Sequence, residues 1–443
     1  MRHAYPGVIT RQLRPDERFI QSDEQEMPLV IEADQSKDLA YLQAFLRSHS
    51  QQIIADIAHY GAVLLRGFAV NSEDDFQSTV LSIEGLRGIE HAFMAEEGRI
   101  SVGNQKYVLH TNAVYKTGGT LYLGGFHSEN YYSTDVPSYI SFWCKKPSTT
   151  GGETGLINMR KVYAHIPEAL KAKLKQQNFY VSKWRVEEIV ERYHITAEAV
   201  ESIAAHFKIP AIGKGKSRFL LMYKPNVFIH PHTNTQALQI NFFEIAGLNE
   251  ALRQCFMKDY AGNTWFWHRL VWRLPYWPLH CIERVYIIVA SFLYSPRGSF
   301  KVFLNKIKTK IASVRPGNRA ILGTQTQRVG ACFTEQDVAE LAQRMRQYYC
   351  SSLWKTGDVL LVDNLQVVHA GMPGAGERTV RAMICNALEM DYNANQSGIL
   401  TCRERSPETV GRYMVEGCLP KFSNVEFIIR SKKQINDEYI SQL

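Results

Sequence analysis

Two histidines and one glutamate in this chain have the residue types that a metal site requires. His127 and Glu129 are separated by one residue, so their side chains lie on the same face if this stretch is a β-strand. His369 comes much later, after the apolar run at 359–362. Two imidazoles and one carboxylate form the facial triad of non-haem Fe(II) oxygenases, which leaves coordination positions open for substrate and O₂. In a chain with 14 histidines a His-x-Glu pair also arises by chance, so the neighbouring motifs decide.

Three further motifs accompany the His-x-Glu pair. The sequence reads GGET at 151–154, GDVLLVDNLQVVH at 357–369 and GER at 376–378. In order and spacing these motifs resemble the TauD/TfdA-like family of Fe(II)- and 2-oxoglutarate-dependent dioxygenases, in the clavaminate-synthase-like and SyrP-like branch that has glutamate in the triad. The resemblance runs from about residue 28 to about residue 388, apart from one insertion. It implies a mainly β fold with α additions: a double-stranded β-helix (jelly-roll, cupin-like) core with flanking helices and a helical insertion.

The resemblance assigns roles to five residues. His127, Glu129 and His369 are expected to bind Fe(II) and form the catalytic centre, with an open position for O₂. Arg378 is expected to bind the distal carboxylate of the co-substrate 2-oxoglutarate, since a guanidinium makes a bidentate pair with a carboxylate. Thr154 matches a position whose hydroxyl also binds the co-substrate. Taken singly, each histidine could be a hydrogen-bonded core residue, and Arg378 could form a surface ion pair with the adjacent glutamate.

A His-x-His pair at 230–232 also has the spacing of metal ligands. In a strand both histidines would face the same way, but Pro231 between them favours a turn or an edge position. No matching carboxylate motif follows, so we expect these histidines to be hydrogen-bonded loop residues. By resemblance this region supplies the substrate pocket, and His232, Thr233 and Asn241 are expected to line it.

The motif region departs from many relatives at two positions. Gly371 and Ala382 stand where those relatives have arginines, the second of which contacts an acidic substrate. Arg381 falls on the opposite face of the same expected strand from position 382. These differences argue against a sulfonate or another small acidic substrate. Glu129 argues for hydroxylation, because related halogenases lack this carboxylate, while desaturation and ring closure stay open.

The expected function is that of an Fe(II)- and 2-oxoglutarate-dependent dioxygenase, an oxidoreductase that hydroxylates an organic small molecule and releases succinate and CO₂. The substrate classes that fit are amino-acid-derived, carrier-tethered and lipid-like molecules. One alternative is a catalytically silent jelly-roll protein that acts as a peripheral membrane or partner-binding module. Another is a hydroxylase of protein side chains. The complete triad together with Arg378 argues against the silent protein.

Residues 264–312 form the insertion in the family pattern. They hold four of the seven tryptophans and eight Lys or Arg residues against one glutamate, which accounts for most of the net charge of +8. Aromatic and basic residues together are typical of segments that lie on anionic membranes. A lid that packs over the active site is the other interpretation, and both stay open. No nucleic-acid-binding motif accompanies the charge, so no nucleic-acid partner is expected.

The remaining sequence sets the expected organisation. Residues 1–27 are polar and predict an N-terminal arm, 28–390 the dioxygenase domain, and 391–443 a C-terminal extension. Eight scattered cysteines, no two closer than sixteen residues, give no zinc pattern and favour free thiols in a reducing compartment. With no signal-peptide pattern and no run of 18 apolar residues, we expect a cytoplasmic protein, with peripheral membrane contact as the open extension of that expectation. The oligomeric state is left open.

Overall fold

A large mixed sheet lies at the centre of the computed structural model, and helices pack against it, which fits a mainly β fold with α additions. The structure describes residues 5–89, 102, 106–111, 123, 125–129, 135–176, 179–187, 190, 196–206, 211–215, 218–225, 227–238, 247–274, 278, 281, 282, 285, 289, 325–327, 333–390 and 402–404. Asn241 and most of the C-terminal extension lie outside these ranges. Within them, no helix combines the length and the apolar character needed to cross a bilayer.

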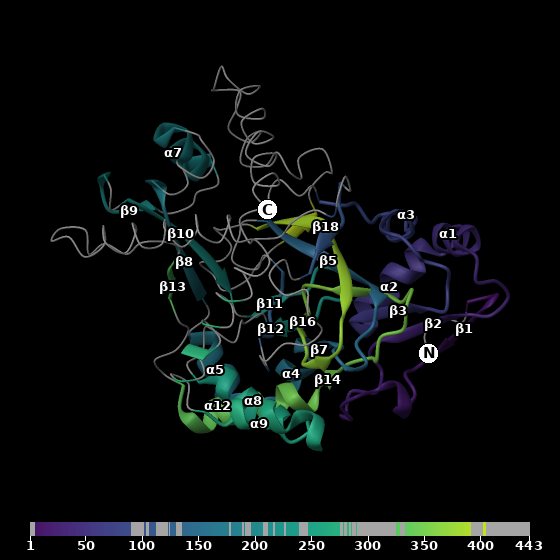
Figure 1. Cartoon of the computed structure of the whole chain (residues 1–443). Helices are drawn as coiled ribbons and strands as arrows, with labels where there is room; N and C mark the ends of the chain where they lie inside the picture. The colour runs from purple at the N-terminus through teal and green to yellow at the C-terminus, as the bar shows by residue number, and fades with distance from the viewer. Residues whose placement is uncertain are drawn as a thin grey trace.

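The largest sheet has eight strands in the order β1-β2-β3-β15-β5-β18-β19, with β4 paired to β18. Only the β2–β3 pair is parallel among these neighbours. Figure 1 shows its long central strands β5 and β18 crossing the middle of the molecule. The strands are β1 (Val8–Arg11), β2 (Leu29–Ala33), β3 (Ala62–Arg66), β4 (Leu109–His110), β5 (Asp135–Lys146), β15 (Val359–Asp363), β18 (Thr379–Met390) and β19 (Cys402–Glu404).

Four smaller sheets complete the β structure. The sheet β14-β7-β16 matters most for the site, because it carries Thr154 of the GGET motif and His369. Its strands are β14 (Tyr349–Cys350), β7 (Thr154–Asn158) and β16 (Val367–Gly371). Two sheets have two strands each: β6 (Thr150–Gly151) pairs with β17 (Gly374–Ala375), and β11 (Val227–Ile229) pairs with β12 (Gln236–Leu238). The last sheet has four strands in the order β13 (Gln325–Gln327), β8 (Phe179–Arg185), β10 (Phe219–Pro225) and β9 (Ala211–Ile212).

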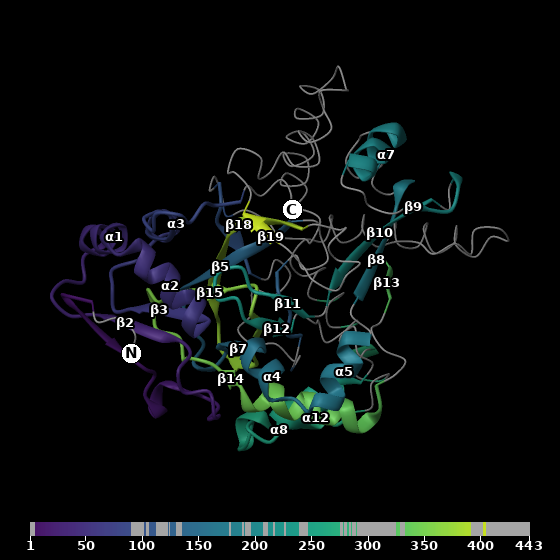
Figure 2. The ribbon, with the colours of Figure 1, turned by 180° about the vertical axis from the view of Figure 1, so that it is seen from behind.

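Helices cover both ends of the molecule. Figures 1 and 2 show α1, α2 and α3 beside the β1–β3 edge of the large sheet, and α4, α5, α8 and α12 gathered at the other end. The helices are α1 (Leu39–Ser48), α2 (Ser50–Tyr60), α3 (Glu73–Leu81), α4 (Met159–His165), α5 (Glu168–Gln176), α7 (Ala197–His206), α8 (Leu248–Met257), α9 (Phe266–Trp272) and α12 (Glu335–Gln347), with 3-10 turns η1 (Pro15–Glu17) and η5 (Asn263–Trp265).

The two faces of the large sheet have different partners, because side chains alternate along a strand. One face packs against α1–α3 through residues such as Val63, Trp143 and Leu361. The opposite face, which includes Phe142, shares a buried cluster with residues of β7, β14 and β16. The large sheet and the β14-β7-β16 sheet therefore form two packed layers with apolar side chains between them.

A buried ion-pair network joins the N-terminal segment to the large sheet. Arg66 at the end of β3 is 1% exposed; it donates to both carboxylate oxygens of Asp358 (3.1 and 2.6 Å) and to Glu17 Oε1 (2.8 Å). Burial alone would raise the pKa of Glu17. Hydrogen bonds from the Arg11 side chain and the Arg14 backbone, together with the charge of Arg66, outweigh burial and hold this pKa well below its usual range. Glu17 is therefore ionised and depends on its basic partners.

Replacing Arg66 tests how strongly this network holds the fold. We expect Arg66→Met to lower the free energy of unfolding by about 3–5 kcal/mol, because it leaves the buried Asp358 carboxyl group without its cation. It also removes one of the two guanidinium partners of Glu17, which keeps Arg11. Lys146→Ala is the matched control: its ion pair with Glu377 is equally short (2.6 Å), but the two side chains are 58% and 62% exposed. That variant should cost about 0–1 kcal/mol. Equal losses in urea denaturation would contradict the role given to burial.

Candidate metal centre

His127 and His369 face each other across two backbone hydrogen bonds. The amide of His127 donates to the carbonyl of His369 (3.1 Å), and the amide of His369 donates to the carbonyl of His127 (2.9 Å). This antiparallel bridge places the segment containing the His-x-Glu pair beside β16. The two imidazole rings lie 4.7 Å apart between their centroids. Residues distant in the sequence are thus brought together by the backbone itself.

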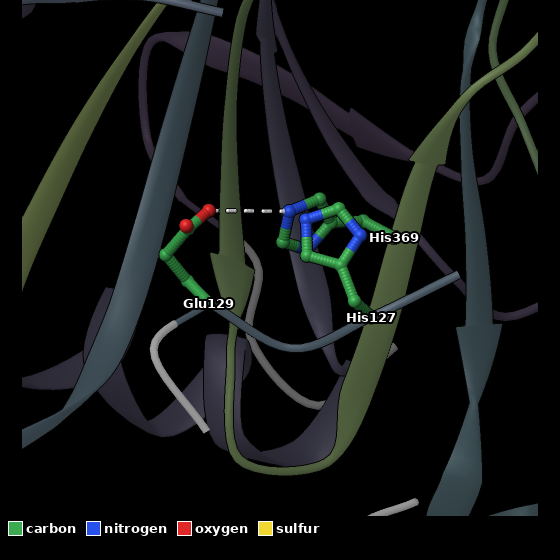
Figure 3. Close-up of side chains that lie close together, drawn as sticks. All are labelled: His127, Glu129 and His369. Carbon is green, nitrogen blue, oxygen red and sulfur yellow. Dashed lines mark ion pairs between the residues drawn. The ribbon is translucent and has the colours of Figure 1, made fainter. Parts of the chain in front are cut away.

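The three side chains of the expected triad converge on one another (Figure 3). One ligand atom from each of His127, Glu129 and His369 lies within 4.8 Å of the other two. Glu129 Oε2 is 3.7 Å from His369 Nε2. Glu129 and His369 are 1% and 4% exposed, and His127 is half-buried. Two imidazoles and a buried carboxylate form a donor set that suits Fe(II) and fills only part of its coordination sphere.

The His127 ring is fixed in one tautomer by its backbone neighbour. His127 Nδ1 lies 2.7 Å from the carbonyl oxygen of Gly125. A carbonyl only accepts hydrogen bonds, so Nδ1 carries the proton and Nε2 keeps its lone pair for a metal. Hydrogen bonds of this kind orient metal-binding histidines in proteins. Sequence reasoning did not identify Gly125, because a backbone carbonyl leaves no signal in the residue types.

The position of Glu129 depends on Asn364, which follows β15. The Asn364 side chain accepts from the amide of Glu129 (2.7 Å) and donates to the carbonyls of Glu129 (3.1 Å) and Pro137 (2.8 Å). The neighbouring Asp363 accepts from His230 Nε2 (2.9 Å) and from Gln366 Nε2 (2.7 Å). These two residues therefore orient the surroundings of the triad, and Asn364 holds the backbone from which the Glu129 carboxylate projects.

An aromatic side chain packs against the third triad residue. Phe142, on β5, meets the His369 ring edge to face at 5.2 Å between centroids. Phe142 is 4% exposed, so it excludes water from this side of the imidazole. The alternation of apolar and polar side chains along β5 indicates that one face of this strand is buried. Only the packing of the two sheets shows that Phe142 faces the strand that carries His369.

The two expected co-substrate residues touch each other. Arg378, immediately before β18, donates from Nη2 to Thr154 Oγ1 (3.1 Å). A Cβ atom built on Gly371, two residues after His369, would lie 3.6 Å from Arg378 Nη1. The guanidinium therefore sits beside the strand that carries His369. The alternative of a surface ion pair with Glu377 is wrong, because Glu377 pairs with Lys146 instead.

Arg378 is a half-buried cation without an anionic partner in the part of the chain that the structure describes. Its Nε atom is buried and has no hydrogen-bond partner there, and no described carboxylate forms an ion pair with it. Burial lowers the pKa of Arg378, because desolvation disfavours the charged form. A partly desolvated charge without a counter-ion is costly, so this position is suited to an anionic ligand.

Two of the three expected substrate-lining residues line a pocket that the triad does not line, and the third is outside the described residues. The side chains of His232, which is exposed, and Thr233, which is half-buried, help to line an open pocket of about 520 Å³ between α2 and the β11–β12 turn. None of the triad residues lines this pocket. His230 is a buried, hydrogen-bonded turn residue, as expected, and is not part of the metal cluster. Asn241 lies outside the described residues.

Comparison with known proteins finds several that are similar to this chain. The DdaC protein of dapdiamide synthesis from Enterobacter agglomerans is 22% identical over 349 residues, covering 74% of this chain and 83% of that protein. PvcB from Pseudomonas aeruginosa is 11% identical, with a TM-score of 0.44 over 86% of this chain and 94% of that one. A taurine dioxygenase from Burkholderia xenovorans is also 11% identical, with a TM-score of 0.45 over 93% and 100%.

A family model gives the decisive match. The model described as "Taurine catabolism dioxygenase TauD, TfdA family" matches residues 22–254, just over half of the chain. This stretch includes His127, Glu129 and Thr154, whereas His369 and Arg378 lie beyond it and meet them only in the fold. The chain therefore belongs to the TauD/TfdA family, and it is a dioxygenase that depends on Fe(II) and 2-oxoglutarate and acts on a small molecule.

Proposed function

We propose that His127, Glu129 and His369 are the Fe(II) ligands of this dioxygenase. The observation that carries the proposal is the convergence of their three ligand atoms within 4.8 Å of one another. The fixed tautomer of His127 and the amide clamp of Asn364 on Glu129 support it, because both hold donor atoms in place before a metal arrives. The iron supplies O₂ activation and the oxidation of substrate, coupled to conversion of 2-oxoglutarate into succinate and CO₂.

We propose that Arg378 and Thr154 bind the distal carboxylate of 2-oxoglutarate. A planar guanidinium with free donors makes a bidentate pair with a carboxylate, and the Thr154 hydroxyl adds one more polar contact. Glu153, between Gly152 and Thr154, forms no ion pair with Arg378 among the described contacts. Burial raises the pKa of Glu153 to about 7, against the lowering effects of Arg378 and the Tyr349 hydroxyl. The Glu153 carboxyl is therefore only partly ionised at neutral pH, which supports a guanidinium that is open to the co-substrate.

The proposed reaction is hydroxylation of an organic small molecule. Amino-acid-derived, carrier-tethered and lipid-like substrates are the classes proposed. Position 371 is glycine and position 382 alanine, and Arg381 donates to Glu73 (3.2 Å), so none of these positions offers a cation to an acidic substrate. Phe142, buried against the His369 ring, keeps water from the reacting groups.

We propose further that the two packed layers belong to a double-stranded β-helix core. The shared buried cluster of β5, β15 and β18 with β7, β14 and β16 supports this assignment. The proposed boundaries are an arm at 1–27, the dioxygenase domain at 28–390 and an extension at 391–443. Within that domain, residues 264–312 are proposed to contact an anionic membrane, which would make the enzyme peripheral to it; their aromatic and basic composition supports this.

Anaerobic titration of the purified protein tests the metal and co-substrate sites. With Fe(II) and 2-oxoglutarate we expect a weak visible charge-transfer band, which a chelator abolishes. His127→Ala should abolish it through loss of iron. Arg378→Ala should retain iron and weaken 2-oxoglutarate binding by about 10- to 100-fold, since hydrogen bonds to charged groups contribute about 1.5–3 kcal/mol.

The matched control for Arg378 is Arg381→Ala. Arg381 lies three residues further along the chain, and it binds Glu73 and contacts His110 rather than Thr154. We expect its band and its 2-oxoglutarate affinity to equal those of the wild type. If the Arg381 and Arg378 variants weaken binding equally, the assignment of the distal carboxylate to Arg378 is wrong.

Glu153 predicts a specific pH dependence of stability. Its pKa is raised from 4.5 to about 7, so the folded state holds the proton more tightly than the unfolded chain. Stability from this group is therefore full below pH 4.5, falls between about pH 4.5 and 7, and stays constant above. The difference is on the order of 3 kcal/mol. Urea unfolding at pH 5 to 8 should show this slope in the wild type and a smaller slope in Glu153→Gln; identical slopes would refute the assignment.

A further inference from the structure

Exposed apolar side chains are concentrated in one part of the described chain. Nine large hydrophobic residues are exposed among all the residues that the structure describes, and six of these nine lie between positions 266 and 289. Scattered exposed hydrophobics are normal, whereas a cluster marks an interaction site. The six are Phe266, Trp267, Leu270, Ile282, Val285 and Val289.

Helix α9 is fixed to the body of the protein by its inward face. Trp265, just before it, and Trp272, at its end, are 3% and 0% exposed. Both pack edge to face against the buried Tyr260, at 4.9 and 5.2 Å between ring centroids. Helix α9 also contacts α8, beside which it lies at the rim of the molecule in Figure 1. The orientation of α9 is therefore set by buried aromatic residues.

The outward face of α9 is apolar as well. Phe266, Trp267 and Leu270 are 52%, 71% and 50% exposed, and the spacing of 266 and 270 places them one helical turn apart. A lid would turn such side chains toward the protein, but here it is Trp265 and Trp272 that face the body. The arrangement leaves an aromatic surface, held in place from behind, without a covering group among the described residues.

Basic groups border this surface. Arg273 is exposed, and Arg269 is half-buried, with Nη1 donating to the carbonyls of Tyr260 (2.5 Å) and Gly262 (2.9 Å). No acidic residue occurs between positions 260 and 274. Further along, Ile282, Val285 and Val289 are each helical and exposed, at a spacing that repeats on one side of a helix. Apolar side chains bordered by positive charge suit a binding partner that has an apolar interior and an anionic outer layer.

We propose that the exposed face of α9, formed by Phe266, Trp267 and Leu270 with Arg273 at its border, docks on an anionic lipid bilayer. The aromatic rings would enter the interfacial region, and the guanidinium would remain with the lipid headgroups. A second copy of the chain fits this face less well, because a two-fold contact brings the same basic residue toward itself. This inference rests on the membrane contact proposed for 264–312, and it is independent of the iron chemistry.

Vesicle sedimentation with the full-length protein tests the docking face. We expect binding to vesicles of phosphatidylcholine with 30% phosphatidylserine, a composition chosen to be about one third anionic. The double variant Phe266→Ser/Trp267→Ser should lose at least roughly tenfold in partitioning. Arg273→Glu should lose roughly tenfold on anionic vesicles and show no change on pure phosphatidylcholine. Leu81→Ser, an exposed leucine of α3, is the matched control and should bind like the wild type.

Two outcomes would overturn the docking face. One is wild-type binding that survives the double substitution unchanged. The other is absence of vesicle binding together with self-association that the double variant abolishes, which would assign the face to a second copy. The iron and 2-oxoglutarate absorption band, recorded on the same samples, separates the two proposals. The docking face is supported if the double variant keeps the absorption band but loses its partitioning to vesicles. If the wild type shows no band, that result counts against the metal site and leaves the docking face unaffected.

Discussion

The site depends first on the reciprocal backbone hydrogen bonds between His127 and His369. Side-chain contacts alone would have to hold two distant segments against the chain entropy that separates them. The bridge holds the two segments together through main-chain amides and carbonyls, which need hydrogen-bond partners wherever they are buried. It fixes the spacing of the two rings, and the third donor follows because Glu129 is two residues away. Asn364 then has only to orient the Glu129 backbone, and Phe142 the His369 ring. Few further groups are therefore needed to order the triad.

Arg66 and Arg378 differ in how their positive charges are compensated. Arg66 is 1% exposed, and the carboxylates of Glu17 and Asp358 pair with it. Arg378 is half-buried, and the described residues offer it only a hydroxyl partner. The same residue type therefore serves two purposes, and the partners distinguish a structural cation from one suited to a ligand.

Much of this could be predicted from sequence, and the reasons are chemical. The triad, Thr154 and Arg378 were predicted through the resemblance to the TauD/TfdA family, because metal coordination and carboxylate binding restrict residue type and spacing in its motifs. The mainly β fold with helices was implied by the same resemblance. The sequence could not predict contacts that depend on the folded backbone. These are the hydrogen bond of the Gly125 carbonyl to His127, the packing of Phe142 on His369, and the packing of Trp265 and Trp272 on Tyr260.

The GGET turn has little room for side chains, and this limits how the enzyme could be altered. A Cβ on Gly374 would lie 2.5 Å from the Cα of Gly152, and one on Gly151 would lie 2.7 Å from the Pro373 carbonyl and 3.3 Å from the Trp265 ring. These glycines form a tightly packed junction between β7 and the segment leading into α9. Laboratory evolution toward new substrates would therefore find few acceptable changes here. Variation has more freedom at open positions such as those lining the pocket beside α2.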